Sequence, residues 1–290
     1  MIPLVALDKI IQFALTEDLG SGDLTTEATV PQETVAVGRA HAKAPTVVCG
    51  GQVFQRVFHQ VDPSVSFEAH AAEGSVADAG SVLWTVRGAA HSLLLGERTA
   101  LNFVQHMCGV ATKARRFVQA LPPGSHTRIT DTRKTMPGLR SLERYAVRSG
   151  GAHNHRDSLG AAVLIKENHI AAAGSITAAI EGARAHAPHT TKIEVEVASL
   201  EQVEEALTAR ADILMLDNFD PAKVARAVAM VNGQALVEVS GGVQLEQIKP
   251  LARLGVDAIS IGALTHSVEA ADISFMIESH GRVTRLSSGP

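Results

Sequence analysis

The chain has 290 residues, of which 46% are hydrophobic, 19% charged and only 3% aromatic, and its formal net charge is −4. This length can bury a large core, and the composition is that of an ordinary globular protein. A small negative charge and few aromatic rings argue against a nucleic-acid binder, which attracts phosphates with cations and stacks bases on rings. Any anion site must therefore be built locally from clustered cations.

The sequence shows neither a membrane span nor a secretory signal. No apolar run approaches the roughly 20 residues of a transmembrane helix, and the first residues lack a basic stretch and a cleavage site. Cys49 and Cys108 stand in apolar surroundings without the spacing of metal ligands. We interpret them as reduced, buried thiols and expect a cytoplasmic protein.

The N-terminal part predicts a small α+β unit. Leu7, Ile11 and Leu15 recur at helical spacing, and the following "GSGDLTT" is interpreted as a loop. From about residue 35 to 86 the pattern is mostly β-like, with one helical stretch, "GQVFQRVFHQV". We expect this unit to form the first domain.

A long helix is predicted from about residue 93 to 121. One side is apolar, with Leu101, Val104 and Cys108 among its members. The polar side carries Arg98, Asn102, Gln105 and Thr112. Taken alone, a polar side of a helix is most simply a solvated surface.

After residue 124 the pattern alternates between short apolar runs and helical stretches. The runs lie at 127–132, 162–167, 192–197, 213–218, 236–242 and 258–264. Such alternation predicts a parallel sheet with crossover helices, and polar residues at each strand end indicate an α/β barrel whose strand ends converge. Six strands are two fewer than a closed barrel needs, so we predict an incomplete one. The predicted domains are 1–112, 113–280 with the active site, and a polar tail, 281–290.

Cations cluster in the first third of the predicted barrel. Between residues 128 and 166 there are eight Lys or Arg and three acids, a local balance of +5. The helical side chains Arg140, Arg144 and Arg148 fit a solvated basic face. Arg133, Lys134 and Lys166 fit that interpretation poorly, because they follow apolar strands. "GGAHNHR", at 150–156, adds a turn and an Arg fork that can approach a ligand.

Acidic and glycine-rich strand ends complete the predicted site. Glu196 and Asp217 end successive strands, and carboxylates near phosphates usually share a Mg²⁺ with the substrate. Glu194 lies on the same strand face as Glu196, so the choice between them stays open. "SGG" (240–242) and "SIGA" (260–263) follow the last two strands, where barrels commonly bind phosphate.

Together these features predict a pocket for a substrate with several negative charges, at least one of them a phosphate. The sequence shows no Ser-His-Asp set, no thiol nucleophile, no GxGxxG turn and no P-loop. Displacement at an activated, phosphorylated carbon, helped by positioning and electrostatics, suits these parts better than covalent catalysis.

Several motifs, in order along nearly the whole chain, resemble the quinolinate phosphoribosyltransferase family. They include "ERTALNFVQHMCGVAT", "DTRKTMPGLRSLERYAVRSGGAHNHR", "VLIKENHI", "MLDN" and "SIGALTHS". The resemblance implies an enzyme of NAD biosynthesis, a pentosyltransferase that joins quinolinate to phosphoribosyl pyrophosphate (PRPP) with Mg²⁺. It releases pyrophosphate and CO₂ and forms nicotinate mononucleotide. The implied fold is an N-terminal α+β sandwich followed by an incomplete, TIM-like α/β barrel.

The resemblance also implies a homodimer in which Arg98 completes the partner's site, and it assigns a role to each predicted residue. The quinolinate carboxylates and nearby phosphate oxygens are expected at Arg98, Thr132, Arg133, Lys134, His155 and Arg156. Ribose hydroxyls, pyrophosphate and Mg²⁺ are expected at Lys166, Glu196 and Asp217, with Glu196 and Asp217 as metal ligands. The 5′-phosphate side of the substrate site is expected at Ser240, Gly241, Gly242, Ser260, Gly262 and Ala263. Lys134, Lys166, Glu196 and Asp217 are the expected catalytic residues, whereas Asp131 is either a structural acid or a ligand contact.

Three alternatives compete with this assignment. A paralogous pyrophosphorylase of molybdenum-transport operons would act on another heteroaromatic acid. "HNH" at 153–155 matches a nuclease motif by name, but that motif needs a ββα metal unit and a basic surface. The segment "AAEGSVADAGSVLWTVRGAA" resembles a lipoyl-type half-barrel, but no Lys lies between residues 47 and 98 to carry a cofactor.

Overall fold

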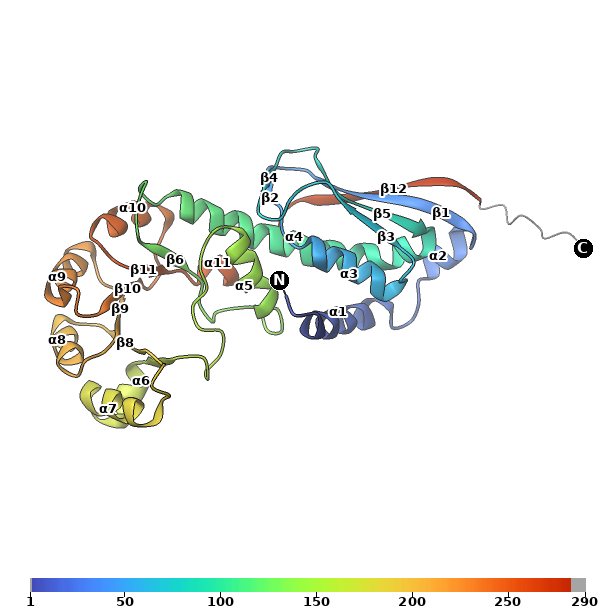
Figure 1. The fold of residues 1–290 in the computed structure, drawn as a ribbon. Helices are drawn as coiled ribbons and strands as arrows, with labels where there is room; N and C mark the ends of the chain where they lie inside the picture. Colours follow the sequence, from blue (N-terminus) through green and yellow to red (C-terminus); the bar gives the residue numbers. More distant parts are fainter. Residues whose placement is uncertain (1, 283–290) are drawn as a thin grey trace, which may run out of the picture. The chain divides into compact units, whose positions relative to one another are not determined.

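The computed structural model describes residues 2–282, with the side chains of 279–282 left aside, and the chain forms two compact units (Figure 1). Unit 1 takes the ranges Met1–Thr112, Pro137–Gly150 and Val268–Pro290, and unit 2 takes Lys113–Met136 and Gly151–Ser267. The polar tail predicted from residue 281 lies outside the described residues, apart from 281 and 282, which end a strand.

Unit 1 contains an antiparallel sheet with the strand order β12-β1-β5-β3. These strands are β1 (Thr34–Ala42), β3 (Ser66–Ala69), β5 (Val82–Ala89) and β12 (Ile273–Arg282), and β2 (Thr46–Val47) pairs separately with β4 (Val76–Ala77). The sequence pattern predicts no strand where β12 lies. β12 crosses from the end of the chain to pair with β1, with Ala40 opposite Phe275.

The helices of unit 1 agree with the predictions except at one place. They are α1 (Leu4–Leu19), α2 (Leu24–Thr29), α3 (Gly51–Val61), α5 (Arg140–Ser149) and most of α4 (Ala90–Gln119), within which the boundary with unit 2 falls. The interpretation of "GSGDLTT" as a loop is wrong at its end, where α2 begins. The Asp23 carboxylate accepts from the N–H groups of Thr25 and Thr26, so it caps this helix.

An aromatic cluster lies between α3 and the sheet in the core of unit 1. The Phe54 and Trp84 rings stack with centroids 5.1 Å apart, and Phe58 stacks on Phe275 of β12 at 6.0 Å. Gly38 on β1 makes room for this packing, because a Cβ there would lie 2.0 Å from the Phe275 ring. These rings account for much of the large apolar surface that this unit buries.

Unit 2 is built on a six-stranded parallel sheet with the order β6-β11-β10-β9-β8-β7. The strands are β6 (Arg128–Thr130), β7 (Val163–Ile165), β8 (Ile193–Val197), β9 (Ile213–Asp217), β10 (Leu236–Ser240) and β11 (Ala258–Ser260). Each of the six predicted runs contains one of them. Because the last strand pairs with the first, the sheet curls round as a barrel that stays open between β6 and β7. The prediction of an incomplete barrel is confirmed.

The opening beside β6 is partly filled by the segment that follows α5. His153 forms a parallel bridge with Thr130, its N–H donates to the Ile129 carbonyl at 2.8 Å, and its carbonyl accepts from Asp131 N–H at 3.1 Å. This pairing runs the segment along β6 and carries the next residues, Asn154 to Arg156, towards the strand ends.

Helices cover the outer side of this barrel (Figure 1). They include α7 (Ile176–His186), α8 (Leu200–Thr208), α9 (Pro221–Val231) and α10 (Leu245–Arg253). The short helices α6 (Glu167–Ala173) and α11 (Ala263–His266) directly follow β7 and β11, and α11 residues Ala263 and His266 line the cavity at the strand ends. Ser175, Ser199 and Asp220 cap α7, α8 and α9 by accepting backbone N–H groups. The caps at Ser199 and Asp220 start α8 and α9 soon after β8 and β9 end, whereas α6 lies between β7 and α7. Among residues 2–282, no helix is both long and apolar enough to cross a bilayer.

Candidate active site

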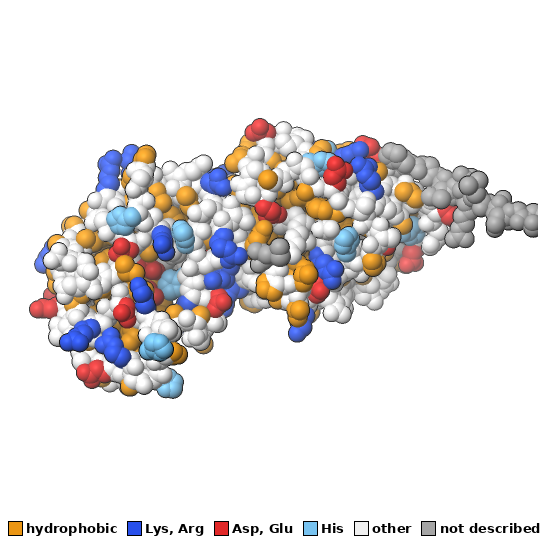
Figure 2. Space-filling view, viewed as in Figure 1, with side chains coloured by type: hydrophobic (Ala, Val, Ile, Leu, Met, Phe, Trp, Pro, Cys, Tyr) orange, Lys and Arg blue, Asp and Glu red, His pale blue; other side chains and the backbone are white. Residues whose placement is uncertain are grey.

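A cavity of about 940 Å³ lies at the carboxyl ends of the strands of unit 2. It is lined by all the predicted site residues except Arg98, namely Thr132, Arg133, Lys134, His155, Arg156, Lys166, Glu196, Asp217, Ser240, Gly241, Gly242, Ser260, Gly262 and Ala263. In the view of Figure 2, the surface of unit 2, on the left, carries Lys, Arg and His side chains close to Asp and Glu side chains. Residues far apart in sequence therefore share one polar pocket.

The loop after β6 presents two adjacent cations to this cavity. Arg133 and Lys134 would point to opposite faces of a strand, but β6 ends at Thr130 and both side chains line the cavity. Thr132 Oγ1 accepts from Lys134 N–H at 3.1 Å, and Thr265 Oγ1 donates to the Lys134 carbonyl at 2.8 Å. These bonds fix the turn that brings both cations to one side.

Asp131 is a structural acid. It is fully buried, and its carboxylate accepts from His155 N–H at 2.7 Å and from Asn154 Nδ2 at 2.5 Å. Asp131 thus ties the segment that carries His155 and Arg156 to the end of β6. This settles the alternative between a structural acid and a ligand contact.

The predicted carboxylates occupy neighbouring strand ends. Glu196 on β8 forms an ion pair with Lys166, and Asp217 at the end of β9 accepts from Asn218 Nδ2 at 2.7 Å. Both carboxylates line the cavity, whereas Glu194 lies one layer deeper and is only 4% exposed. Of the two, Glu196 is therefore the one that faces the cavity.

The glycine turn after β10 needs its glycines. Gly241 has a φ of 99° and Gly242 a φ of 60°, which side-chain-bearing residues rarely adopt. A Cβ at Gly241 would also lie 2.2 Å from Asn218 Oδ1. Glycine here lets the backbone amides reach the cavity without a side chain in between.

Sequence reasoning did not assign a role to several lining residues. Lys113, on α4, donates to the Ser267 carbonyl at 2.6 Å, and burial, together with the charge on Arg116, lowers the pKa of its ammonium group. His266 Nδ1 lies 2.7 Å from Ser267 Oγ. The signal for His266 and Ser267 was their place in "SIGALTHS", which follows a strand end.

The polar side of α4 does not behave as one surface. Arg98 and Asn102 are exposed, but Gln105 Nε2 donates to the Ile273 carbonyl at 2.8 Å and Thr112 Oγ1 accepts from Val47 N–H at 2.8 Å. The interpretation of this side as solvated is therefore wrong for Gln105 and Thr112, which bond inside unit 1. Arg98 remains available on unit 1 for a ligand or a partner.

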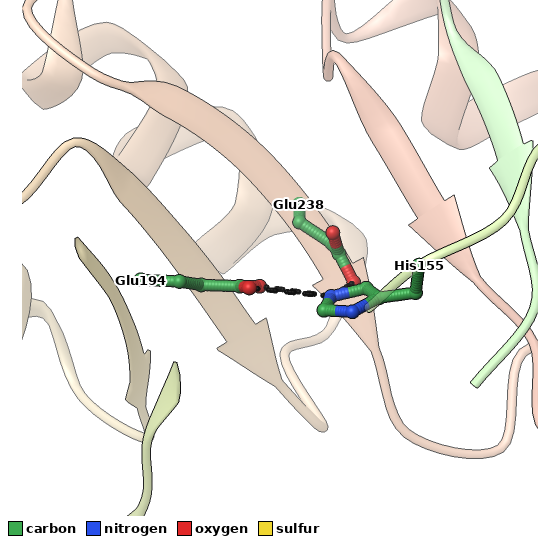
Figure 3. Close-up of side chains that lie close together, drawn as sticks. All are labelled: His155, Glu194 and Glu238. Atoms are coloured by element: carbon green, nitrogen blue, oxygen red, sulfur yellow. Dashed lines mark hydrogen bonds and ion pairs between the residues drawn. The ribbon is translucent and has the colours of Figure 1, made fainter. Parts of the chain in front are cut away.

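Beneath the cavity lies a group that the sequence did not predict, made of His155, Glu194 and Glu238 (Figure 3). His155 Nε2 lies 3.2 Å from Glu194 Oε2 and 3.5 Å from Glu238 Oε1. Burial, reinforced by the charge on Glu194, raises the pKa of Glu238 to about 7. For His155, burial lowers the pKa, but the hydrogen bond to Glu194 and the charge on Glu238 outweigh it and the net direction is upward.

Comparisons with known proteins identify this architecture. Residues 110–276 match the family model "Quinolinate phosphoribosyl transferase, C-terminal domain", and residues 23–108 match its N-terminal domain. The chain belongs to the quinolinate phosphoribosyltransferase family. It is 40% identical to the probable nicotinate-nucleotide pyrophosphorylase [carboxylating] of Bacillus subtilis, over 92% of each chain. It is 44% identical to that of Mycobacterium leprae, over 91% of this chain and 94% of the other.

Solved structures agree with this family. The crystal structure of NadC from Streptococcus pyogenes is 38% identical, covers 97% of this chain and 99% of its own, and has a TM-score of 0.92. A protein of the quinolinate phosphoribosyltransferase family with this sheet order is not a ββα nuclease, and "HNH" is here the segment that pairs with β6. In the lipoyl-like segment, the Glu73 carboxylate accepts from Gly50 and Gly51 N–H groups and from the Tyr145 hydroxyl, so this turn is tied to α3 and α5 of unit 1.

Proposed function

We propose that this chain transfers the 5-phosphoribosyl group of PRPP to quinolinate and decarboxylates the product, giving nicotinate mononucleotide, pyrophosphate and CO₂. The observation that carries the proposal is the composition of one cavity, in which cations from three loops face two carboxylates and a glycine turn. None of the relatives compared above is named for a different heteroaromatic acid, so the molybdenum-operon alternative has no support.

The cations suit a dicarboxylate beside a phosphorylated sugar. Arg133, Lys134 and Arg156 offer planar forks and a point charge to the two quinolinate carboxylates. Burial and the neighbouring charge of Arg133 lower the pKa of Arg156, a sign of closely packed cations that an anionic ligand would relieve. The turn 240–242 offers backbone N–H groups for the 5′-phosphate.

In the transfer step, the quinolinate nitrogen attacks the anomeric carbon while the bond from that carbon to pyrophosphate breaks. Positive charge builds on the ribose, and the carboxylates of Glu196 and Asp217, which line the cavity, would offset it. Lys166 holds Glu196 and faces the cavity as well. Positioning and electrostatics thus replace covalent catalysis in this site.

The second step removes the carboxylate next to the new pyridinium nitrogen. The electron pair of the breaking carbon–carbon bond stays on the ring carbon, where the positive nitrogen stabilises it, and a proton then replaces CO₂. Three apolar side chains, Leu164, Met215 and Ile261, are among those that line the cavity. A carboxylate held against such side chains would be poorly solvated, which favours its loss as neutral CO₂.

Glu196 and Asp217 are the proposed Mg²⁺ ligands. The two carboxylates lie on adjacent strand ends and line the same cavity as the turn 240–242, which is proposed to bind the 5′-phosphate. Mg²⁺ commonly takes such carboxylate oxygens together with the oxygens of substrate phosphates. When bound, the ion neutralises pyrophosphate charge. Glu196 already pairs with Lys166, so the residues fit a metal that arrives together with the substrate.

We further propose a cytoplasmic homodimer in which Arg98 completes the partner's site. Cys49 and Cys108 are free and fully buried, which suits a reducing compartment. Arg98 is exposed on α4, where it can reach another chain.

The proposal is tested by incubating the purified chain with quinolinate, PRPP and Mg²⁺ and separating the nucleotides by chromatography. Nicotinate mononucleotide should form from quinolinate and not from nicotinate. Formation of a nucleotide from another heteroaromatic acid, with none from quinolinate, would contradict the assignment.

A further inference from the structure

Two buried carboxylates compete for one proton donor beneath the cavity. Glu194 and Glu238 are 4% and 5% exposed, and both face the Nε2 atom of His155 (Figure 3). Nε2 carries at most one hydrogen, and its hydrogen bond goes to Glu194 Oε1 at 3.4 Å, with Glu194 Oε2 3.2 Å away. The 3.5 Å contact from Nε2 to Glu238 Oε1 is not a hydrogen bond. Glu238 Oε1 is left buried without a hydrogen-bond donor. An ionised carboxylate in that position would be strongly disfavoured, so the geometry keeps Glu238 as the neutral acid.

The other ring nitrogen of His155 is also occupied. The Arg156 N–H group donates to His155 Nδ1 at 2.7 Å, so Nδ1 carries a lone pair and no hydrogen. The ring is then the neutral tautomer with its hydrogen on Nε2, pointing at the carboxylates. Neither nitrogen is left to hold a substrate carboxylate.

The same geometry argues against a metal ion in this group. The ligand atoms of His155, Glu194 and Glu238 lie within 4.8 Å of one another, which is close enough for a cation. However, a metal would need the Nε2 lone pair, and Nδ1 already uses its own lone pair for the Arg156 N–H. A ring with both nitrogens unprotonated would be an imidazolate, which is a poor match for two nearby carboxylates.

We infer that His155, Glu194 and Glu238 form a buried positioning site that holds Arg156 in place, with the hydrogen of the ring on Nε2 and Glu238 as a carboxylic acid. His155 is thus a positioning residue, instead of the direct substrate contact that the resemblance implied. The site is anchored on β8 and β10, while the segment with His155 and Arg156 is tied to β6 through Asp131.

The groups around Glu238 support this assignment. Burial, and after it the charge on Glu194 of β8, raises the pKa of Glu238 to about 7, although His155, the Ser260 hydroxyl of β11 and Lys166 lower it. Arg156 in turn is fixed at both ends, because its N–H donates to the ring and its Nη1 donates to the Ala162 carbonyl at 2.9 Å. A change in protonation at Glu238 is therefore expected to alter the position of Arg156, because the His155 ring contacts both residues.

The first test needs no substrate. Multiple-bond ¹H–¹⁵N spectra of ¹⁵N-histidine-labelled protein, with His155 assigned through its backbone, should show Nδ1 unprotonated and Nε2 protonated near pH 7. Raising the pH should shift these signals as Glu238 ionises, and Glu238→Gln should abolish that transition. Glu246→Gln, which removes an exposed carboxylate on α10, should leave it unchanged. Adding Zn²⁺ should not alter the ring signals.

A ring protonated on both nitrogens near pH 7 would overturn the inference, and so would a transition that survives Glu238→Gln or a Zn²⁺-dependent shift of Nε2. Because these readouts use free protein, they stand apart from any failure of the proposed function.

The second test rests on the proposed function and asks whether the group acts through Arg156. Glu194→Ala should lower kcat/KM for quinolinate in the wild-type background, but have much less effect in the Arg156→Ala background. Equal losses in both backgrounds would show that Glu194 acts independently of Arg156 and would refute the positioning role. An inactive wild-type chain would count against the proposed function alone.

Discussion

Replacing Glu238 with Gln should make unit 2 less sensitive to rising pH. The carboxyl has an ordinary pKa of 4.5 and a pKa of about 7 when buried in the folded protein. Between these values the folded state binds more protons than the unfolded state, so wild-type stability falls as the pH rises. The penalty is nearly absent below about pH 4.5 and fully present above about pH 7. Glutamine has the shape of the protonated acid and cannot ionise, so the variant lacks this penalty.

The magnitude follows from the same two values. At 1.36 kcal/mol for each pKa unit, the wild type should lose roughly 2–3 kcal/mol relative to the variant between about pH 5 and pH 8.

Hydrogen exchange of the β8 and β10 amides, followed by mass spectrometry, measures this difference inside unit 2. Wild type and variant are compared at each pH, so the chemical exchange rate cancels, and a pH-independent offset from the new amide does not matter. Glu246→Gln serves as the matched control, since it removes an exposed carboxylate of the same unit. A wild-type-to-variant difference that stays constant from pH 5 to pH 8 would refute the buried, neutral Glu238.

Three further predictions concern the proposed chemistry. Lys134→Ala should lower kcat/KM for quinolinate by about 10²–10³-fold, because Lys134 lines the cavity. The control Lys223→Ala, which removes an exposed cation on α9, should leave kcat/KM unchanged. Near-normal turnover by Lys134→Ala would show that Lys134 is not part of the site. Mixed dimers of Arg98→Ala and Lys166→Ala chains should regain about half of the wild-type activity, because one site per dimer is intact if sites are shared. Isolated heterodimers without activity would contradict the shared site. EDTA should abolish turnover and added Mg²⁺ should restore it, while full activity without a divalent ion would exclude Glu196 and Asp217 as its ligands.

Much of unit 2 could be predicted because its signals are local. Parallel strands buried on both faces are short apolar runs, and the runs at 192–197, 213–218 and 236–242 carry near their ends the polar residues Glu196, Asp217 and Ser240, which line the cavity. The turn at Gly241 and Gly242 was recognisable because positive φ values and close backbone approach both require glycine. Convergence of these ends then followed from the barrel, with no knowledge of side-chain contacts.

The remaining features depend on contacts between distant segments. β12 pairs with β1 across more than two hundred residues, and no local pattern encodes a partner at that distance. The sequence pattern did not single out Glu238, because it lies inside an apolar strand. Glu and Val nevertheless alternate in β8 and in β10, so Glu194 and Glu238 each lie on the opposite face of their strand from the neighbouring Val residues. That these two faces meet at His155 depends on the segment beside β6, which only the tertiary structure reveals.

The central claim, a phosphoribosyl transfer coupled to decarboxylation, is tested most directly by following both leaving groups in one reaction. Quinolinate labelled in the carboxyl group next to the ring nitrogen is incubated with PRPP, and labelled CO₂ and pyrophosphate are measured together. The proposed function predicts equal amounts of the two, appearing only when both substrates are present. Pyrophosphate release without labelled CO₂ would contradict it.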